Sequence, residues 1–195
     1  KVRQKRYIEL EGESKNIYNR LRTSALAIVE DSTISFSNKL TEIIKLHQVC
    51  NGFTKNDDGE IMTLHKSKLK ALEETLDETD GKVIIWANYL YNIHEIKKFL
   101  IDKYGPESTV SIYGEVSVQD RKDAVDRIQQ DPKCRFLVGN PTTGGFGLTL
   151  TAVNTVIYFS NNYNLEIRKQ SEDRAHRMGQ KGTVVYIDIV ARNTL

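Results

Sequence analysis

From residue 82 onward, short apolar runs alternate with segments of helical periodicity. The first run, Val83 to Ala87, is continuously apolar, which is typical of a strand covered on both faces. The pattern predicts further strands at 110–113, 135–138, 155–159 and 183–190, with helices at 90–104, 117–130 and 165–178 and a short helix before 155. Strands joined by helices through short connections predict a parallel sheet with right-handed crossovers. The predicted fold class is therefore α/β.

The first third of the chain has a different pattern. Residues 4–10 read as extended, and apolar residues then recur at helical spacing over 14–29 and 35–50. Residues 54–59 read as a polar loop, and Ser67 is expected to cap a third helix that ends near residue 80. We therefore expect a helical segment over 1–80 and a sheet domain over 81–195.

Composition sets limits on the class of protein. The chain has 195 residues, of which 39% are hydrophobic and 28% charged, as in a soluble globular domain. It has neither an apolar run of transmembrane length nor a visible signal peptide. The separated Cys50 and Cys134 suggest reduced thiols in a cytosolic compartment, and the four histidines show no metal-ligand spacing.

Net charge does not by itself point to nucleic acid, because it is only +2. A local basic cluster stands at the start of the chain, where Lys1, Arg3, Lys5 and Arg6 fall within six residues. This cluster is either a binding face or an ordinary charged surface.

The carboxyl edge of the predicted sheet is the expected location of a ligand. In open parallel sheets ligands bind beyond the carboxyl ends of the strands. This rule places Asn88, Gly114, residues 140–147 and residues 161–164 on one rim.

Residues 140–147 contain a glycine-rich stretch. Gly144, Gly145 and Gly147 fall within four positions at a strand-to-helix turn. Such a turn lets backbone N–H groups approach a phosphate, although a tight turn also needs glycines. It is not a Walker A loop, because no Gly-Lys-Ser/Thr follows.

Two arginines stand near the end of the predicted helix over 165–178. Arg174 and Arg177 are three residues apart, and Gln170 precedes Arg174 by four, so all three share one face of a helix. Gly179 is expected to end that helix. A rigid pair of guanidinium groups can grip the charge on a transferring phosphoryl group. Basic residues in a last helical turn also complement the helix dipole.

Other polar residues near these arginines have structural interpretations. Glu172 and Asp173 are adjacent, so they point in different directions and do not form a general acid–base pair. One of them is expected to orient a neighbouring arginine. Asp188 and Trp86 lie inside predicted strands, where a buried hydrogen-bonded role and a core role are expected.

Five stretches carry a resemblance to a known family. They are residues 173–180 (Asp-Arg-Ala-His-Arg-Met-Gly-Gln), residues 144–152, residues 82–89, the set Gly114, Ser117 and Arg121, and residues 46–52. Taken along the chain from residue 46 to residue 180, they follow the order of, and resemble, motifs of the C-terminal half of Swi/Snf-type DNA-dependent ATPases of helicase superfamily two. The matches run over nearly the whole chain, and the string over 173–180 is the most specific.

The resemblance implies a RecA-like C-terminal motor lobe preceded by lobe-linking helices. Arg174 and Arg177 would be arginine fingers that reach an ATP held by the N-terminal lobe of the same protein, and Gln170, Gly145 and Gly147 would line the nucleotide cleft. The resemblance also implies DNA contacts, at Thr143, Thr149, Gly114, Ser117 and Arg121.

The same resemblance implies what this chain lacks. ATP and Mg²⁺ would be bound mainly by the N-terminal lobe, since neither a Walker A loop nor an Asp-Glu-x-His motif occurs in this sequence. The chain alone is then expected to have negligible ATPase activity, and the whole protein to act on double-stranded DNA inside the cell. The sequence departs from the common family pattern at Tyr113, Thr142, Tyr163 and Leu165. These departures mainly concern the details of DNA contact, and the variant sequence as a whole favours a bacterial or phage branch of the family.

Other functions share parts of this pattern. An RNA helicase lobe of the same superfamily has the same architecture, although the string over 173–180 argues against it. A non-catalytic α/β interaction module could keep the fold without the chemistry. A sugar-nucleotide transferase lobe is disfavoured, because no acidic donor-binding pattern accompanies the glycines.

Overall fold

The computed structural model describes residues 1–143 and 148–194, which form two compact units. The sheet unit consists of Lys1–Arg6 and Leu72–Val190, and the helical unit consists of Tyr7–Ala71 and Ala191–Leu195. The division into functional segments 1–80 and 81–195 remains a prediction.

A six-stranded sheet forms the centre of the sheet unit, with the strand order β1-β8-β7-β4-β6-β5. The strands are β1 (Val2–Ile8), β4 (Val83–Trp86), β5 (Thr109–Ile112), β6 (Phe136–Gly139), β7 (Thr155–Tyr158) and β8 (Val185–Ala191). The pairs β4–β6, β4–β7, β5–β6 and β7–β8 are all parallel. Their register aligns Trp86 with both Gly139 and Tyr158, so the carboxyl ends of these strands form one rim.

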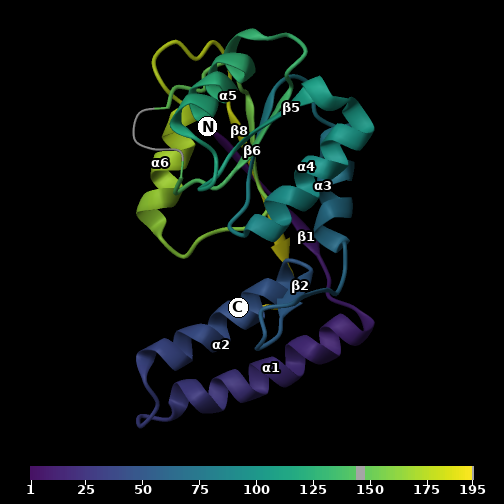
Figure 1. Cartoon of the computed structure of the whole chain (residues 1–195), viewed down its shortest axis with the longest axis vertical. Coiled ribbons are helices and arrows are strands. Elements are labelled where there is room, and N and C mark those ends of the chain that lie inside the picture. The colour runs from purple at the N-terminus through teal and green to yellow at the C-terminus, as the bar shows by residue number, and fades with distance from the viewer. Residues whose placement is uncertain (144–147, 195) are drawn as a thin grey trace. The chain divides into compact units, whose positions relative to one another are not determined.

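Helices cover both faces of this sheet. Helix α4 (Leu90–Tyr104) lies on one face, whereas α5 (Val118–Gln130) and α6 (Leu165–Ala175) lie on the other (Figure 1). A 3₁₀ turn, η1 (Pro106–Ser108), leads into β5, and α3 (Ser67–Asp77) runs from the helical unit into the sheet unit. The expected α/β fold with flanking helices is confirmed.

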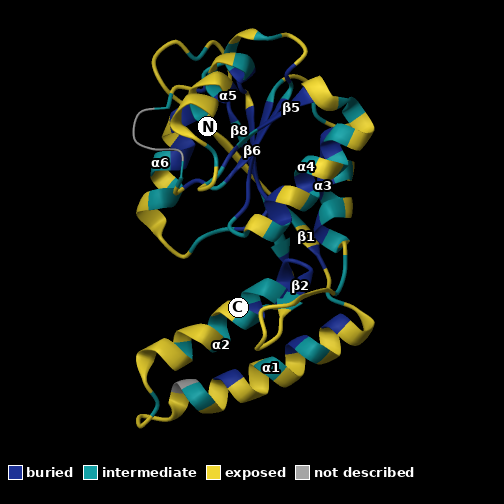
Figure 2. Cartoon of the chain, in the orientation of Figure 1, coloured by how far each residue is buried: buried dark blue, intermediate teal, exposed yellow. Residues whose placement is uncertain are grey.

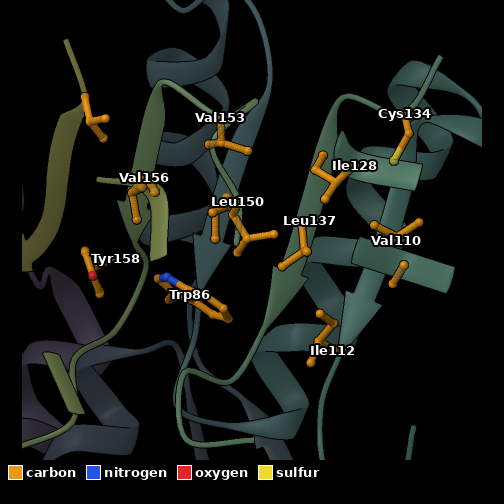
Figure 3. Packing of buried hydrophobic residues seen from close by; sticks show 14 of the residues in the cluster. Trp86, Val110, Ile112, Ile128, Cys134, Leu137, Leu150, Val153, Val156 and Tyr158 are labelled. Atoms are coloured by element: carbon orange, nitrogen blue, oxygen red, sulfur yellow. The ribbon is translucent and has the colours of Figure 1, made fainter. Parts of the chain in front are cut away.

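Alternation along each strand builds an apolar layer on both faces. Every residue of β4 is buried, and Ile84 and Trp86 face the same cluster as Ile128 of α5 and Ala175 of α6. Figure 3 shows Trp86 beside Tyr158 and Leu137 in this cluster. At about 25 cal/mol per Å² of apolar surface removed from water, this burial is the main term that holds the sheet together.

The helical unit contains α1 (Gly12–Glu30) and α2 (Phe36–Cys50), which lie side by side and are largely exposed along their outer faces (Figure 2). It also contains an antiparallel hairpin, β2 (Phe53–Lys55) and β3 (Ile61–Thr63). The prediction of a plain polar loop over 54–59 is therefore wrong at its start. In the described part of the chain, no helix is long and apolar enough to cross a membrane.

Two further expectations need correction. Helix α6 ends at Ala175 with His176 as its C-cap, so it stops three residues before the predicted end. No helix forms over 148–154 among the described residues, where a short helix was expected. The other predicted strands and helices occur within a few residues of their expected bounds.

Candidate functional site

Side-chain and backbone hydrogen bonds join the carboxyl ends of four strands into one rim. The backbone N–H of Asn88, after β4, donates to Ser160 Oγ after β7 at 2.7 Å. Asn140, after β6, donates from Nδ2 to the Asn88 carbonyl at 3.3 Å and from its backbone N–H to the Ile112 carbonyl at 3.0 Å. The expectation that Asn88 and Asn140 share one rim is confirmed.

Residues 140–143 form the stem of the glycine-rich loop, and local bonds give this stem its shape. Asn140 Oδ1 accepts from the Thr142 N–H at 2.9 Å and from the Thr142 hydroxyl at 2.6 Å. This is the Asx turn that asparagine commonly makes two residues ahead. Thr143 closes the turn by donating its N–H to the Asn140 carbonyl at 3.2 Å.

Two arginines from different helices hold this stem by its carbonyl groups. Arg174 of α6 donates from Nη2 to the Pro141 carbonyl at 3.1 Å. Arg121 of α5 donates from Nη1 to the Thr143 carbonyl at 3.3 Å and from Nη2 to the Gly114 carbonyl at 3.2 Å. Both guanidinium groups therefore converge on the loop where the sequence predicted a nucleotide or DNA contact.

Arg174 is a buried cation, with only 5% of its surface exposed. Its guanidinium lies 5.4 Å from the centre of the Trp86 ring. Burial lowers the pKa of Arg174; interaction with Tyr158 opposes this, and the charge of Arg177 lowers the pKa further. Arginine still remains cationic in proteins. A desolvated cation of this kind interacts strongly with an added anion, because little water screens it.

Arg177 differs from Arg174 in position and exposure. It lies beyond the end of α6 and is exposed, and its Nε donates to the Asp173 carbonyl at 3.2 Å. The prediction that both arginines share one face of a continuous helix is therefore wrong. Gly179 does have a positive φ of 98°, but it sits in the segment after the helix and does not end the helix itself.

Gln180 folds this segment back onto the lobe. Its Nε2 donates to the Ala175 carbonyl at 3.0 Å and to the Val153 carbonyl at 2.9 Å. Its backbone N–H donates to the Arg177 carbonyl at 3.1 Å. These bonds turn the chain after α6 and satisfy a carbonyl at the helix end, which is a site that helices leave unpaired.

The remaining predicted site residues lie on or beside these elements. Gln170 is one turn before Arg174 on α6, and its Nε2 donates to Glu166 Oε1 at 3.3 Å. Ser117 is the N-cap of α5. Thr149 is exposed and precedes Leu150, whose N–H donates to the Arg174 carbonyl at 3.0 Å. The predicted nucleotide residues Gly145 and Gly147 lie outside the described residues.

Sequence reasoning missed Arg168, whose guanidinium bonds to three side chains at this rim. Arg168 donates to both carboxylate oxygens of Asp188, at 2.6 and 3.0 Å, to Asn161 Oδ1 at 2.6 Å and to Glu172 Oε1 at 3.0 Å. Its guanidinium lies 3.4 Å from the centre of the Tyr158 ring. The spacing of four between Arg168 and Glu172 was the available signal.

This network gives Asp188 the hydrogen-bonded role expected, although its side chain is 14% exposed and so only partly buried. It also confirms that Glu172 orients a neighbouring arginine, although that arginine is Arg168. Groups of three or more histidine, cysteine, aspartate or glutamate side chains able to hold a metal ion are absent among the described residues.

The fold and this rim define a RecA-like α/β lobe of the helicase type. Residues 67–179 match the helicase conserved C-terminal domain, and the chain belongs to that family. The expected resemblance to the C-terminal lobe of Swi/Snf-type ATPases is confirmed.

Known proteins similar to this chain agree with the family. An uncharacterized ATP-dependent helicase of Mycoplasma genitalium is 30% identical over 97% of this chain, which covers 18% of that protein. The chain spans less than a fifth of the length of the curated relatives it matches.

Solved structures show the same fold. The C-terminal part of the Fun30 ATPase domain superposes with a TM-score of 0.77 at 19% identity, over 100% of this chain and 86% of that one. The Sulfolobus solfataricus SWI2/SNF2 ATPase core in complex with dsDNA gives a TM-score of 0.73 at 24% identity, over 97% of this chain and 41% of that one.

Proposed function

We propose that this chain is the C-terminal motor lobe of an ATP-dependent DNA translocase of the Swi/Snf type. The observation that carries the proposal is the convergence of Arg174 and Arg121 on the stem of the glycine-rich loop, at the carboxyl rim of the sheet. Arg174 lies on α6, which carries the residues proposed to face the nucleotide, and Arg121 lies on α5, beside the residues proposed to face DNA. The stem over 140–143 therefore connects the proposed nucleotide site with the proposed DNA site.

We assign different roles to the two catalytic arginines. Arg177, which is exposed beyond α6, reaches the γ-phosphoryl group and stabilises the charge that spreads over its oxygens. Arg174 holds the loop through Pro141 and adds its positive field from a buried position. Gln170, Gly145 and Gly147 complete the nucleotide side of the cleft.

The DNA side is formed by residues around the second arginine. Gly114, Ser117, Arg121, Thr143 and Thr149 contact the sugar-phosphate backbone. Contacts of this type position a protein on DNA without reading its sequence. The similar SWI2/SNF2 ATPase core was solved in complex with dsDNA, which supports DNA as the ligand of this side.

ATP and Mg²⁺ are bound mainly by the N-terminal lobe of the same protein. This chain has neither a phosphate-binding Gly-Lys-Ser/Thr loop nor an Asp-Glu-x-His motif, which together would hold the metal and the nucleotide. The chain alone is therefore inactive, and the whole protein works on double-stranded DNA inside the cell. Residues 7–71 of the helical unit belong to the lobe-linking segment over 1–80. The two Mycoplasma relatives fit a bacterial or phage source, whereas other relatives are fungal INO80 ATPases.

The test is the substitution Arg177→Ala in the protein that carries both lobes. DNA-stimulated ATP hydrolysis should fall by about 10³- to 10⁵-fold, as for other arginine fingers, while ATP binding measured by fluorescence titration stays unchanged. Near-normal turnover would overturn the assignment. Arg174→Ala should also abolish turnover, but it removes a buried contact and therefore requires a parallel measurement of folding.

Nucleic-acid choice is tested separately from the arginine. ATP hydrolysis by the unmodified two-lobe protein should be stimulated by duplex DNA and not by RNA. Stimulation by RNA alone would favour the RNA helicase alternative. Strong ATPase activity in this 195-residue chain would contradict the two-lobe mechanism.

A further inference from the structure

Three of the four residues of the basic cluster at the start of the chain form ion pairs within the sheet unit, namely Lys1, Arg3 and Arg6. Lys1 Nζ lies 2.9 Å from Asp173 Oδ1 and 3.8 Å from Glu172 Oε2. Arg3 Nη2 lies 2.7 Å from Glu172 Oε2. Both carboxylates directly precede Arg174, so the start of β1 contacts the helix that carries the site.

Burial makes the Glu172 contact the more important of the two. Only 6% of the Glu172 side chain is exposed, whereas 60% of the Asp173 side chain is exposed. A buried carboxylate needs partners, and Glu172 takes them from Arg168 and Arg3 on different elements. Removing Arg3 therefore leaves a buried charge with weaker compensation, an effect that a surface pair does not produce.

Strand β1 also contacts the chain after Arg174 and Arg177, at the start of β8. The Val2 N–H donates to the Val184 carbonyl at 3.0 Å, where the chain enters β8. Tyr186 of β8 donates its hydroxyl to the Glu172 carbonyl at 2.7 Å, and Lys1 Nζ lies 5.8 Å from the centre of its ring. Burial raises the pKa of Tyr186 to about 12, so this hydroxyl keeps its proton at neutral pH.

Residues 172–184, which we call the arginine segment, are therefore held at both ends by residues 1–3. We propose that Lys1 and Arg3 are positioning residues that fix the arginine segment, and through it Arg177, for phosphoryl transfer. This proposal rests on the proposed function. It assigns the basic cluster a structural partner in place of a nucleic acid.

Two readouts test the inference in the two-lobe protein. The double variant Lys1→Gln with Arg3→Gln should speed amide hydrogen exchange over the arginine segment by about threefold or more and lower kcat for DNA-stimulated ATP hydrolysis about three- to tenfold, with the KM for ATP unchanged. The single variant Arg3→Lys should retain most of the unmodified kcat, because a lysine keeps the positive charge beside Glu172. Arg6→Gln is the matched control, since Arg6 lies on the same strand but pairs with Glu78; it should change neither readout.

Each contrary result is informative. Unchanged exchange over the arginine segment, or an equal change in the Arg6→Gln control, overturns the inference. A weaker DNA affinity with a smaller salt dependence and no change in exchange overturns it in favour of a DNA contact. If kcat depends on Arg177 but not on Lys1 and Arg3, only the positioning role fails. If kcat is also insensitive to Arg177→Ala, the proposed function fails.

Discussion

The sheet unit and the helical unit differ in what they bury. Strand β4 buries only apolar side chains, and the buried charged residues of the sheet unit among the described residues, Glu172 and Arg174, lie on α6. The helical unit also buries a charge, Lys68, which is 5% exposed and donates to the neutral Asn51 Oδ1 at 2.8 Å. The Asn51 carboxamide in turn donates to the His47 carbonyl, and the His65 ring bonds to the Val49 carbonyl.

This difference has consequences for charge. Burial, with a smaller effect from the charge of Lys68, lowers the pKa of His47 to about 4. Burial also lowers the pKa of His65, although its bond to the Val49 carbonyl opposes the shift. The sheet unit therefore draws its stability mainly from apolar burial, whereas the helical unit depends on two histidines that must stay neutral beside a buried lysine.

The largest expected effect is at a glycine of the helical unit. A Cβ on Gly52 would lie 2.3 Å from the His65 carbonyl oxygen, and its φ of +93° disfavours any other residue. Gly52→Ala combines a backbone clash with a strained conformation and should lower the free energy of unfolding by about 4 kcal/mol. Urea denaturation measures this change. A loss below about 1 kcal/mol would show that the hairpin after Gly52 moves away freely.

Acid is the next largest perturbation, and it should act on the helical unit alone. His47 binds a proton at its ordinary pKa of 6.5 when unfolded and at about 4 when folded. The unfolded state is therefore favoured as the pH falls from 6.5 to 4, and stability is complete above that window. The loss approaches roughly 3 kcal/mol at 1.36 kcal/mol per pKa difference of one.

Hydrogen exchange at pH 7 and pH 5 locates this loss. Amides of α2 should lose protection at pH 5, while amides of β4 and β6 keep it. His47→Gln should flatten the pH dependence, and His94→Gln, at an exposed position of α4, should not. An equal loss of protection in both units would contradict the assignment to the helical unit.

The sequence predicted the sheet better than it predicted the site. Continuous apolar runs such as 83–87 predicted buried strands, because only a sheet covered on both faces accepts them. The hairpin over 53–63 was missed because its strands have three residues each, although Asn56 and Gly59 are turn residues.

The end of α6 could not be predicted from local pattern. The spacing of Arg174 and Arg177 favoured one helical face, but Gln180 turns the chain back by binding the Val153 carbonyl 27 residues away. The bonds from Arg121 and Arg174 to the loop stem likewise join elements distant in sequence. Such contacts depend on the assembled sheet, which residue spacing alone does not describe.

A glycine of the sheet unit gives a smaller effect with the same kind of contact. A Cβ on Gly139 would lie 2.3 Å from the Ile112 carbonyl oxygen and 3.3 Å from the Trp86 ring, but its φ needs no glycine. Gly139→Ala should therefore lower the free energy of unfolding by about 2 kcal/mol, about half the effect at Gly52. The same urea titration ranks the two variants. The reverse order would mean that backbone strain at Gly52 contributes little.

The smallest contrast is between two serines that precede helices, one in each unit. Ser117 Oγ accepts from the Asp120 N–H at 3.1 Å and donates to its carboxylate at 2.8 Å, whereas Ser35 makes no side-chain bond that caps α2. Ser117→Ala should lower the free energy of unfolding by about 1 kcal/mol, and Ser35→Ala should change it little.

Ser117→Asp separates this capping role from the proposed DNA contact. An aspartate still accepts the Asp120 N–H, but its charge repels the Asp120 carboxylate that Ser117 Oγ contacts at 2.8 Å. Some stability should therefore be lost in thermal denaturation, and Ser117→Ala, which loses the cap without adding a charge, is the matched reference for DNA affinity. The negative charge of the aspartate would repel a DNA phosphate, so DNA affinity of the two-lobe protein should fall in a binding titration. Full affinity in Ser117→Asp would remove Ser117 from the DNA side and leave it as the residue that begins α5.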